Sequence, residues 1–230
     1  MEVIPMAMSP ELAKMFKEQS KKNQDNLRRA YEDLNKVAQK GQILFTGSSL
    51  MEQFPINEIA MSFGVTKTIY NRGVGGTTTD DFLAHIHTVL LDLVPGKIFI
   101  NIGTNDIAVR PDGTPWQQHL FENYEKILTI IQTQLPEAEV YMMAYYPINA
   151  TLPNIPEWTR HTLSIRTNEA LNETNQKLAA LAEKYGYHFI DCNENLKDAD
   201  GNQRAEFSKD GMHMFPAGYV EVFKALQRYL

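Results

Sequence analysis

Short apolar stretches alternate with longer amphipathic ones along the chain, and this alternation limits the available folds more than any other feature. Strands are predicted at 43–46, 97–102, 140–145 and 187–191, with a weaker one at 67–70, and most of them have room for a helix between them. Strands that alternate with helices form βαβ units, which place parallel strands in one sheet and helices on both faces. The pattern therefore predicts an α/β three-layer sandwich with a mainly five-stranded parallel sheet. This alternation of strands and helices is flavodoxin-like.

The helices begin and end at recognisable sequence signals. Ser9-Pro10-Glu11 is typical of a helix N-terminus, and we expect that helix to run to Gln39 and to end at Gly41. Thr77 or Thr78 is expected to cap another helix. Further helices are predicted over 115–135, 163–185 and 216–230, and a long loop with three prolines over 146–160.

The chain has 230 residues and lacks a Pro/Gly-rich tract that would separate two large units. We therefore predict a single domain over residues 42–230, with residues 1–41 as an N-terminal helical extension. The extra helix is amphipathic, so it either packs on the domain or joins two copies in a homodimer.

Charge and composition exclude some partners. The formal net charge is −6, which argues against nucleic acid and anionic membrane surfaces. The sequence contains no run of about 18 apolar residues, as a membrane span requires. Cys192 is the single cysteine; it cannot form an internal disulfide and is expected to be a small buried residue. The expected location is cytoplasmic, and the expected partner is a small molecule.

Four short segments carry residues suited to chemistry. They are GSSL at 47–50, GVGG at 73–76, GTND at 103–106 and DGMH at 210–213. The first three follow predicted strands, and the fourth precedes the last predicted helix. Loops after the carboxyl ends of parallel strands line one crevice, so the fold brings these segments together. They supply a serine, donors for an oxyanion and an Asp-His pair, which are the parts of a serine acyl hydrolase.

These segments resemble the SGNH hydrolase superfamily, the GDSL-type esterases and lipases, over residues of about 42–219. The resemblance implies Ser49 as nucleophile, His213 as general base and Asp210 as its partner, with no cofactor or metal. It implies Ser49, Gly76 and Asn105 as the oxyanion hole. Ser48 stands where the family usually has Asp, and Met214-Phe215 follow the histidine where Pro and Asn are common.

Each segment also has a simpler interpretation. Ser48 and Ser49 could be helix N-caps, Asn105 could cap a helix with Thr104, the glycines at 73–76 could form a tight turn, and a lone DxxH spacing is often a surface turn. The occurrence of all four segments, each at a strand end or in a loop, favours catalysis.

The substrate is less defined by the sequence. Tyr146 and Trp158 frame the proline-containing loop, where they would either line the substrate pocket or pin the loop by packing. Because no large apolar lid is evident, we expect hydrolysis of small acyl esters such as O-acetyl carbohydrate. A lysophospholipase or thioesterase, a sugar O-acyltransferase and a non-catalytic carbohydrate-binding module are the alternatives.

Overall fold

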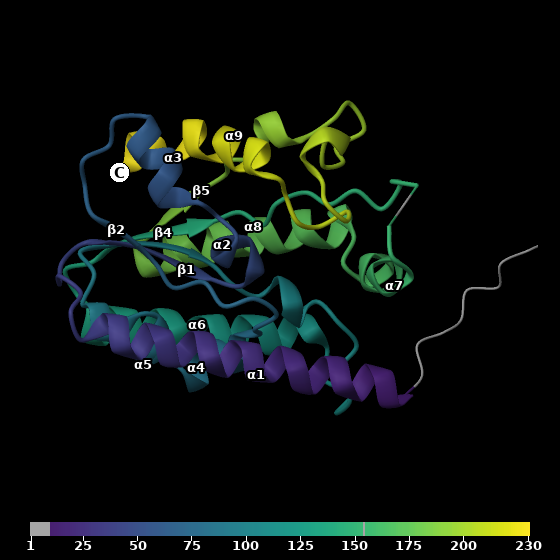
Figure 1. Cartoon of the computed structure of the whole chain (residues 1–230), viewed down its shortest axis with the longest axis horizontal. Coiled ribbons are helices and arrows are strands. Elements are labelled where there is room, and N and C mark those ends of the chain that lie inside the picture. The colour runs from purple at the N-terminus through teal and green to yellow at the C-terminus, as the bar shows by residue number, and fades with distance from the viewer. Residues whose placement is uncertain (1–9, 154) are drawn as a thin grey trace, which may run out of the picture.

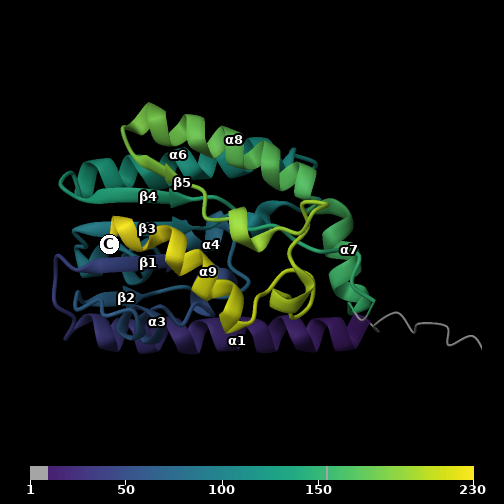
Figure 2. The same cartoon turned by 90° about the horizontal axis from the view of Figure 1, so that it is seen from above.

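Five parallel strands form one sheet in the part of the chain that the structure describes. The computed structural model describes residues 10–153 and 155–230, with side chains except those of Pro10, Ala13 and Trp158. The strand order is β2-β1-β3-β4-β5 (Figure 2). The strands are β1 (Ile43–Gly47), β2 (Ile69–Asn71), β3 (Lys97–Asn101), β4 (Glu139–Met143) and β5 (His188–Ile190). This confirms the predicted α/β sandwich and its parallel sheet.

Helices cover both faces of the sheet (Figure 1). One face carries α3 and α9, and the other carries α4, α5, α6 and α8, with α1 alongside α5. The helices are α1 (Pro10–Asn35), α2 (Ser49–Glu52), α3 (Ile56–Ser62), α4 (Thr79–Ala84), α5 (Ile86–Val89), α6 (Trp116–Gln134), α7 (Glu157–Ile165), α8 (Asn168–Tyr185) and α9 (Pro216–Leu226).

The residue alternation of the strands divides the core into two halves. Phe45, Phe99 and Tyr141 occupy one register across β1, β3 and β4, and neighbouring rings stack at 4.6 and 4.9 Å between centroids. Successive side chains of a strand point to opposite faces, so this aromatic row contributes to the core under α3 and α9. Tyr219 and Phe223 of α9 are fully buried in the same cluster.

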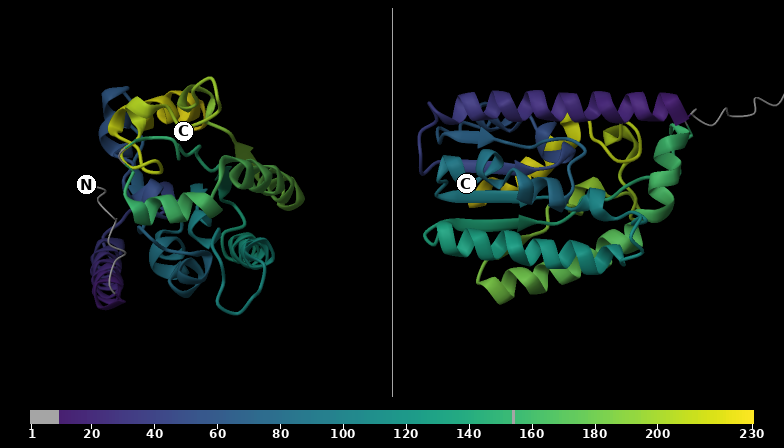
Figure 3. Two further views of the ribbon diagram at one scale, coloured as in Figure 1. Left: turned by 90° about the vertical axis from the view of Figure 1, so that its right-hand side faces the viewer. Right: turned by 90° about the horizontal axis from the view of Figure 1, so that it is seen from below.

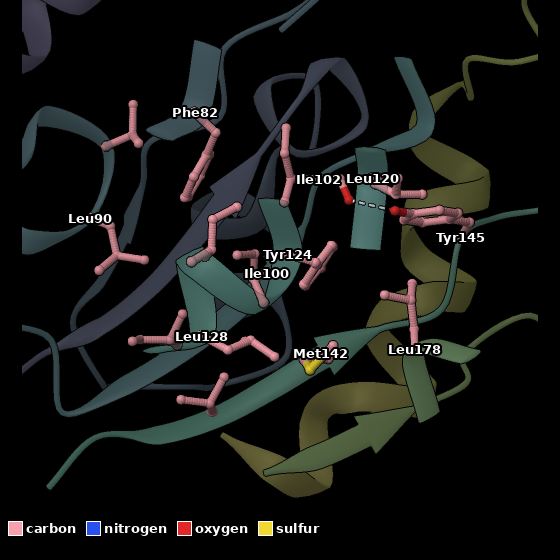
Figure 4. Packing of buried hydrophobic residues seen from close by; sticks show 14 of the residues in the cluster. Phe82, Leu90, Ile100, Ile102, Leu120, Tyr124, Leu128, Met142, Tyr145 and Leu178 are labelled. Carbon is pink, nitrogen blue, oxygen red and sulfur yellow. Dashed lines mark hydrogen bonds between the residues drawn. The ribbon is translucent and has the colours of Figure 1, made fainter. Parts of the chain in front are cut away.

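The opposite half of the core packs the sheet against α6 and α8 (Figure 4). Ile100 and Met142 are fully buried there with Leu128 and Leu178. The Tyr145 hydroxyl lies inside this half and donates a hydrogen bond of 2.6 Å to the Ile102 carbonyl, the dashed line in Figure 4. The bond fixes the chain just after β3, where the GTND segment begins.

Three predicted boundaries were wrong. The helix predicted over 163–185 is two helices, because Arg166 leaves the helical region at φ −86° and ψ 73° and Thr167 caps α8 by accepting from the Ala170 amide. The first of these, α7, begins inside the loop predicted over 146–160. The N-terminal helix ends at Asn35 rather than Gln39, and the predicted N-cap Ser9 lies outside the described residues.

The N-terminal helix runs along the whole domain and reaches the side on which α7 lies (Figure 3). Its second half packs on the body through Leu27 and Tyr31. Its first half exposes Met15 and Phe16, which are 65% and 59% accessible. A homodimer through this helix, and a domain boundary after residue 41, stay predictions.

Candidate active site

Ser49, His213 and Asp210 form a hydrogen-bonded chain at the edge of the sheet. Ser49 begins α2 directly after β1, while Asp210 and His213 lie in the loop before α9. The Ser49 Oγ is 2.9 Å from His213 Nε2, and His213 Nδ1 is 2.7 Å from Asp210 Oδ2. The structure thus brings together three predicted residues that are up to 164 positions apart.

The turn at 210–213 explains how one loop presents both the acid and the histidine. Asp210 Oδ1 accepts from the Met212 and His213 amides at 3.0 and 2.8 Å. Burial alone raises the pKa of Asp210, but hydrogen bonds from His213 and Met212 outweigh it and lower that pKa to about 2. An ionised carboxylate only accepts, so Nδ1 of His213 carries the proton and Nε2 faces the Ser49 hydroxyl.

Ser48 does not share this geometry. Its side chain is fully buried, its Oγ contacts no hydrogen-bond partner among the described residues, and it makes no side-chain cap to α2. Of the two adjacent serines, only Ser49 reaches His213.

The oxyanion candidates lie on the same side. Gly76 and Asn105 line one cavity with Ser49. Gly76 has φ +74°, a left-handed conformation that L side chains rarely adopt, so the loop needs glycine there. Within the described part of the chain, the Ser49 and Gly76 amides donate to no acceptor. Both amides therefore remain free to donate to an anionic oxygen.

The side-chain amide of Asn105 has a fixed orientation. Its Nδ2 donates to the Thr77 carbonyl at 2.9 Å, and its Oδ1 accepts from Arg166 Nη2 at 3.2 Å. A carbonyl only accepts and a guanidinium only donates, so a flipped amide would lose both bonds. The second N–H of Asn105 stays available for the cavity. The turn Thr104–Asp106 has Gly103 as its N-cap and therefore receives no side-chain cap.

The backbone before Asn105 is held closely against the core. Gly103 has φ +112°, and a Cβ there would lie 2.3 Å from the Tyr145 hydroxyl. Behind Asn105, the buried Asp106 carboxylate accepts from the Thr79 amide and hydroxyl. Burial raises the pKa of Asp106 above its ordinary value. These contacts connect the GTND turn to Tyr145 on one side and to α4 on the other.

The N-terminal helix holds the loop that carries Gly76. Gln24 Nε2 donates to the Gly75 carbonyl at 2.8 Å, and the Tyr31 hydroxyl donates to the Gly73 carbonyl at 2.8 Å. The Gly75 amide in turn donates to the Glu52 carboxylate of α2. The loop is therefore fixed between α1 and the helix that begins with Ser49.

The cavity beside Ser49 has a volume of about 260 Å³. Tyr146 lines it; the residue is 2% exposed and its hydroxyl has no hydrogen-bond partner among the described residues. The Trp158 side chain, the other predicted substrate contact, lies outside the described side chains. Further lining residues are Leu50, Thr104, Ile148, Thr162, Arg166, Leu171, Met212 and His213.

Sequence reasoning missed Arg166. The residue was placed inside one long helix, 163–185, where an arginine is ordinarily a solvated surface residue. The signal that could have found it is Thr167-Asn168, a plausible N-cap that would end one helix and begin another.

Other polar residues do not extend the site. Among residues 10–153 and 155–230, no three His, Cys, Asp or Glu side chains are placed to hold a metal ion. Cys192 is buried, and burial raises the pKa of its thiol to about 12, in keeping with its predicted structural role. None of the described helices has both the length and the apolar character that crossing a bilayer requires.

The fold and the residues at this edge define the class of α/β serine hydrolases, and comparison with known proteins gives the family. The family model of the GDSL-like Lipase/Acylhydrolase family matches residues 57–220, most of the chain, although the match begins after Ser49. The chain belongs to this family, within the SGNH hydrolase superfamily, and is a serine ester hydrolase.

Three similar proteins illustrate the relationship. A structure from Streptococcus pneumonia, proposed to be a platelet activating factor, has 30% identity and a TM-score of 0.83, over 96% of this chain and 99% of that one. Platelet-activating factor acetylhydrolase IB subunit alpha1 from Bos taurus is 25% identical over 82% of this chain and 75% of its own. A variant of an acetyl xylan esterase from Geobacillus stearothermophilus has 17% identity and a TM-score of 0.59, over 83% of this chain and 95% of that one.

Proposed function

We propose that the protein hydrolyses small acyl esters through an acyl-Ser49 intermediate, with an O-acetylated carbohydrate as the preferred kind of substrate. The observation that carries the mechanism is the Ser49–His213–Asp210 hydrogen-bond chain. Neither a cofactor nor a metal takes part in the proposed reaction.

The proposed steps use this chain of hydrogen bonds and the donors beside it. His213 Nε2 removes the Ser49 proton as Oγ attacks the ester carbonyl, and Asp210 holds the imidazole and stabilises the imidazolium. The Ser49 and Gly76 amides and the Asn105 side chain donate to the oxyanion of the tetrahedral intermediate. His213 then protonates the departing alcohol, and the same sequence with water releases the acid and restores Ser49.

The size of the cavity supports a short acyl group. Its volume of about 260 Å³ lies near the lower end of the range of roughly 300–1,000 Å³ that is usual for ligand pockets. Two of the similar proteins are described by their names as acting on acetyl groups. A lysophospholipase or thioesterase would use the same residues with a longer acyl site, and a sugar O-acyltransferase would replace water with an alcohol.

A series of p-nitrophenyl esters from acetate to palmitate tests the acyl length. We expect kcat/KM to be highest for acetate or propionate and to fall with chain length. A maximum at octanoate or longer would contradict the small-acyl proposal and favour a lipase-like pocket. Acetyl transfer to an added sugar that exceeds release of free acetate would favour the acyltransferase.

Fluorophosphonate labelling with mass spectrometry tests the nucleophile. We expect the adduct on Ser49, and Ser49→Ala should lower kcat by about 10⁴–10⁶-fold. Ser48→Ala is the matched control, because the Ser48 hydroxyl is buried and does not line the cavity. This variant should keep kcat within a few-fold of the wild-type value. An adduct on Ser48, or full turnover by Ser49→Ala, would refute the mechanism.

A further inference from the structure

Arg166 is a buried cation with few of its hydrogen bonds made. Arg166 lies at the junction of α7 and α8 and is only 8% exposed. A guanidinium has five N–H donors. Among the described residues, Arg166 side-chain bonds reach only the Asn105 Oδ1 and the Met212 Sδ, each at 3.2 Å. Its Nε is buried and has no partner there.

No carboxylate neutralises this guanidinium in the described part of the chain. The ion pairs there, each with N–O distances of at most 4.0 Å, do not include Arg166. Asp106 acts on it electrostatically from farther away, but Asp106 is already hydrogen-bonded to Thr79. Burial lowers the pKa of Arg166 to about 10, so the group still carries its charge at neutral pH. A buried charge without a partner is costly, so a partner from outside the chain would be bound favourably.

The position of Arg166 makes that partner part of the substrate. Arg166 lines the same cavity as Ser49 and Asn105. Because one cavity is lined by both residues, a substrate with its ester at the Ser49 hydroxyl can place a neighbouring anionic group at the guanidinium. Guanidinium groups match carboxylates and phosphates through paired, charge-assisted hydrogen bonds.

We propose that Arg166 is the anion receptor of this cavity, and that the physiological substrate is an ester with a carboxylate or phosphate close to the scissile bond. The inference rests on the function proposed above and narrows it, for example from an acetylated neutral sugar to an acetylated acidic or phosphorylated one. Arg166 binds the anion, while its bond to Asn105 keeps the oxyanion donor in place.

Matched ester pairs that differ mainly in charge test the proposal. Acetoxyacetate is compared with its amide, 2-acetoxyethyl phosphate with 2-acetoxyethanol, and mono-p-nitrophenyl succinate with p-nitrophenyl butyrate. The three pairs distinguish a carboxylate from a phosphate, and an anion in the alcohol from one in the acyl group. For at least one pair we expect wild-type kcat/KM to favour the charged ester by roughly 10- to 100-fold. Preference for the neutral ester in all three pairs would overturn the proposal.

Two variants identify Arg166 as the source of that preference. Arg166→Gln keeps a donor for Asn105 but removes the charge, so the charged-to-neutral ratio should fall to one or below. Arg166→Lys keeps the charge without the paired donors and should retain an intermediate ratio. An unchanged ratio in Arg166→Gln, with the folded state verified by circular dichroism, would contradict the assignment.

Binding to Ser49→Ala separates this proposal from the mechanism, because it needs no turnover. Calorimetry with acetoxyacetate and with inorganic phosphate should detect binding of at least one anion that is lost in Ser49→Ala/Arg166→Gln. If that binding is found but wild-type protein hydrolyses no ester, the anion site stands and the proposed hydrolysis fails. If p-nitrophenyl acetate is hydrolysed but neither anion binds, the hydrolysis stands and the anion site fails.

Discussion

Arg72 and Arg166 are buried to a similar degree, and neither forms an ion pair in the described part of the chain, yet their surroundings differ. The Arg72 guanidinium lies over the rings of Tyr31 and Tyr70, at 4.8 and 5.5 Å, and donates to Asn35 Oδ1 and the Asn71 carbonyl. Its charge is enclosed by partners from α1 and β2. Arg166 instead has one amide oxygen and one thioether sulfur as acceptors, each at 3.2 Å, and it lines a cavity.

The comparison shows that burial of a charged side chain does not by itself indicate function. At Arg72 the protein supplies rings and carbonyl oxygens on several sides, so the residue joins the N-terminal helix to the sheet. At Arg166 part of the hydrogen-bonding capacity is left to whatever enters the cavity. Changes in the cavity region should therefore alter activity, and changes around Arg72 should alter stability.

The largest effect in the cavity region, apart from loss of Ser49, is expected for Asn105. Asn105→Ala removes one donor to the oxyanion, which should lower kcat by roughly 10²–10³-fold with little change in KM. Steady-state kinetics on p-nitrophenyl acetate measures both constants. Asn105→Asp serves as the control, since it keeps the shape but replaces the donor by an acceptor, and it should be at least as impaired. A loss confined to KM would make Asn105 a binding residue instead.

The two arginines should differ next in stability. Arg72→Met removes two hydrogen bonds and two ring contacts and leaves Asn35 Oδ1 buried without its donor, so we expect the free energy of unfolding to fall by about 2 kcal/mol. Arg166→Met removes a poorly partnered buried charge, which offsets the loss of the donor to Asn105 Oδ1, and should change it by less than about 1 kcal/mol. Urea denaturation followed by fluorescence measures both. Equal decreases in the free energy of unfolding for the two variants would show that the two arginines do not differ in their contribution to stability.

The smallest expected effect concerns Asp210, whose carboxylate accepts hydrogen bonds from His213 and Met212. Its pKa is about 2 in the folded protein and near 3.8 without the fold, so its stabilising effect is complete above about pH 4 and is lost as the pH falls toward 2. The difference in free energy of unfolding between wild type and Asp210→Asn should therefore shrink over this interval, by about 1 kcal/mol after solvent screening. Denaturation series between pH 2 and pH 6 measure it. A difference that grows on acidification would contradict the lowered pKa.

The sequence predicted much of the sheet and the part of the site that depends on strand ends. Apolar runs locate strands, and the parallel topology then places Ser49, Gly76 and Asn105 at one edge without any knowledge of side-chain packing. The choice of Ser49 over Ser48 came from the family resemblance, since two adjacent serines satisfy the same pattern. The distance to His213 agrees with that choice.

Features that depend on tertiary contacts could not be predicted in the same way. The break between α7 and α8 arises because Thr167 caps a new helix instead of continuing the first one. Hydrophobic periodicity does not reveal such a break. The short helices α2 and α3 are below the length at which an amphipathic pattern is recognisable. Arg166 was missed for the same reason as the helix break, because its role follows from the cavity and not from its neighbours in sequence.

The contacts of Gln24 and Tyr31 with the loop of Gly76 have a consequence for how related enzymes diverge. These residues lie outside the segment 57–220 that matches the family, yet they fix the carbonyls of Gly75 and Gly73. Substitutions in this helix would contact no substrate atom. A comparison of relatives that is restricted to the conserved family segments would not detect them. We expect such substitutions to raise or lower kcat by changing the mobility of the loop that carries Gly76. Two family members with identical motifs can therefore differ in their catalytic rates.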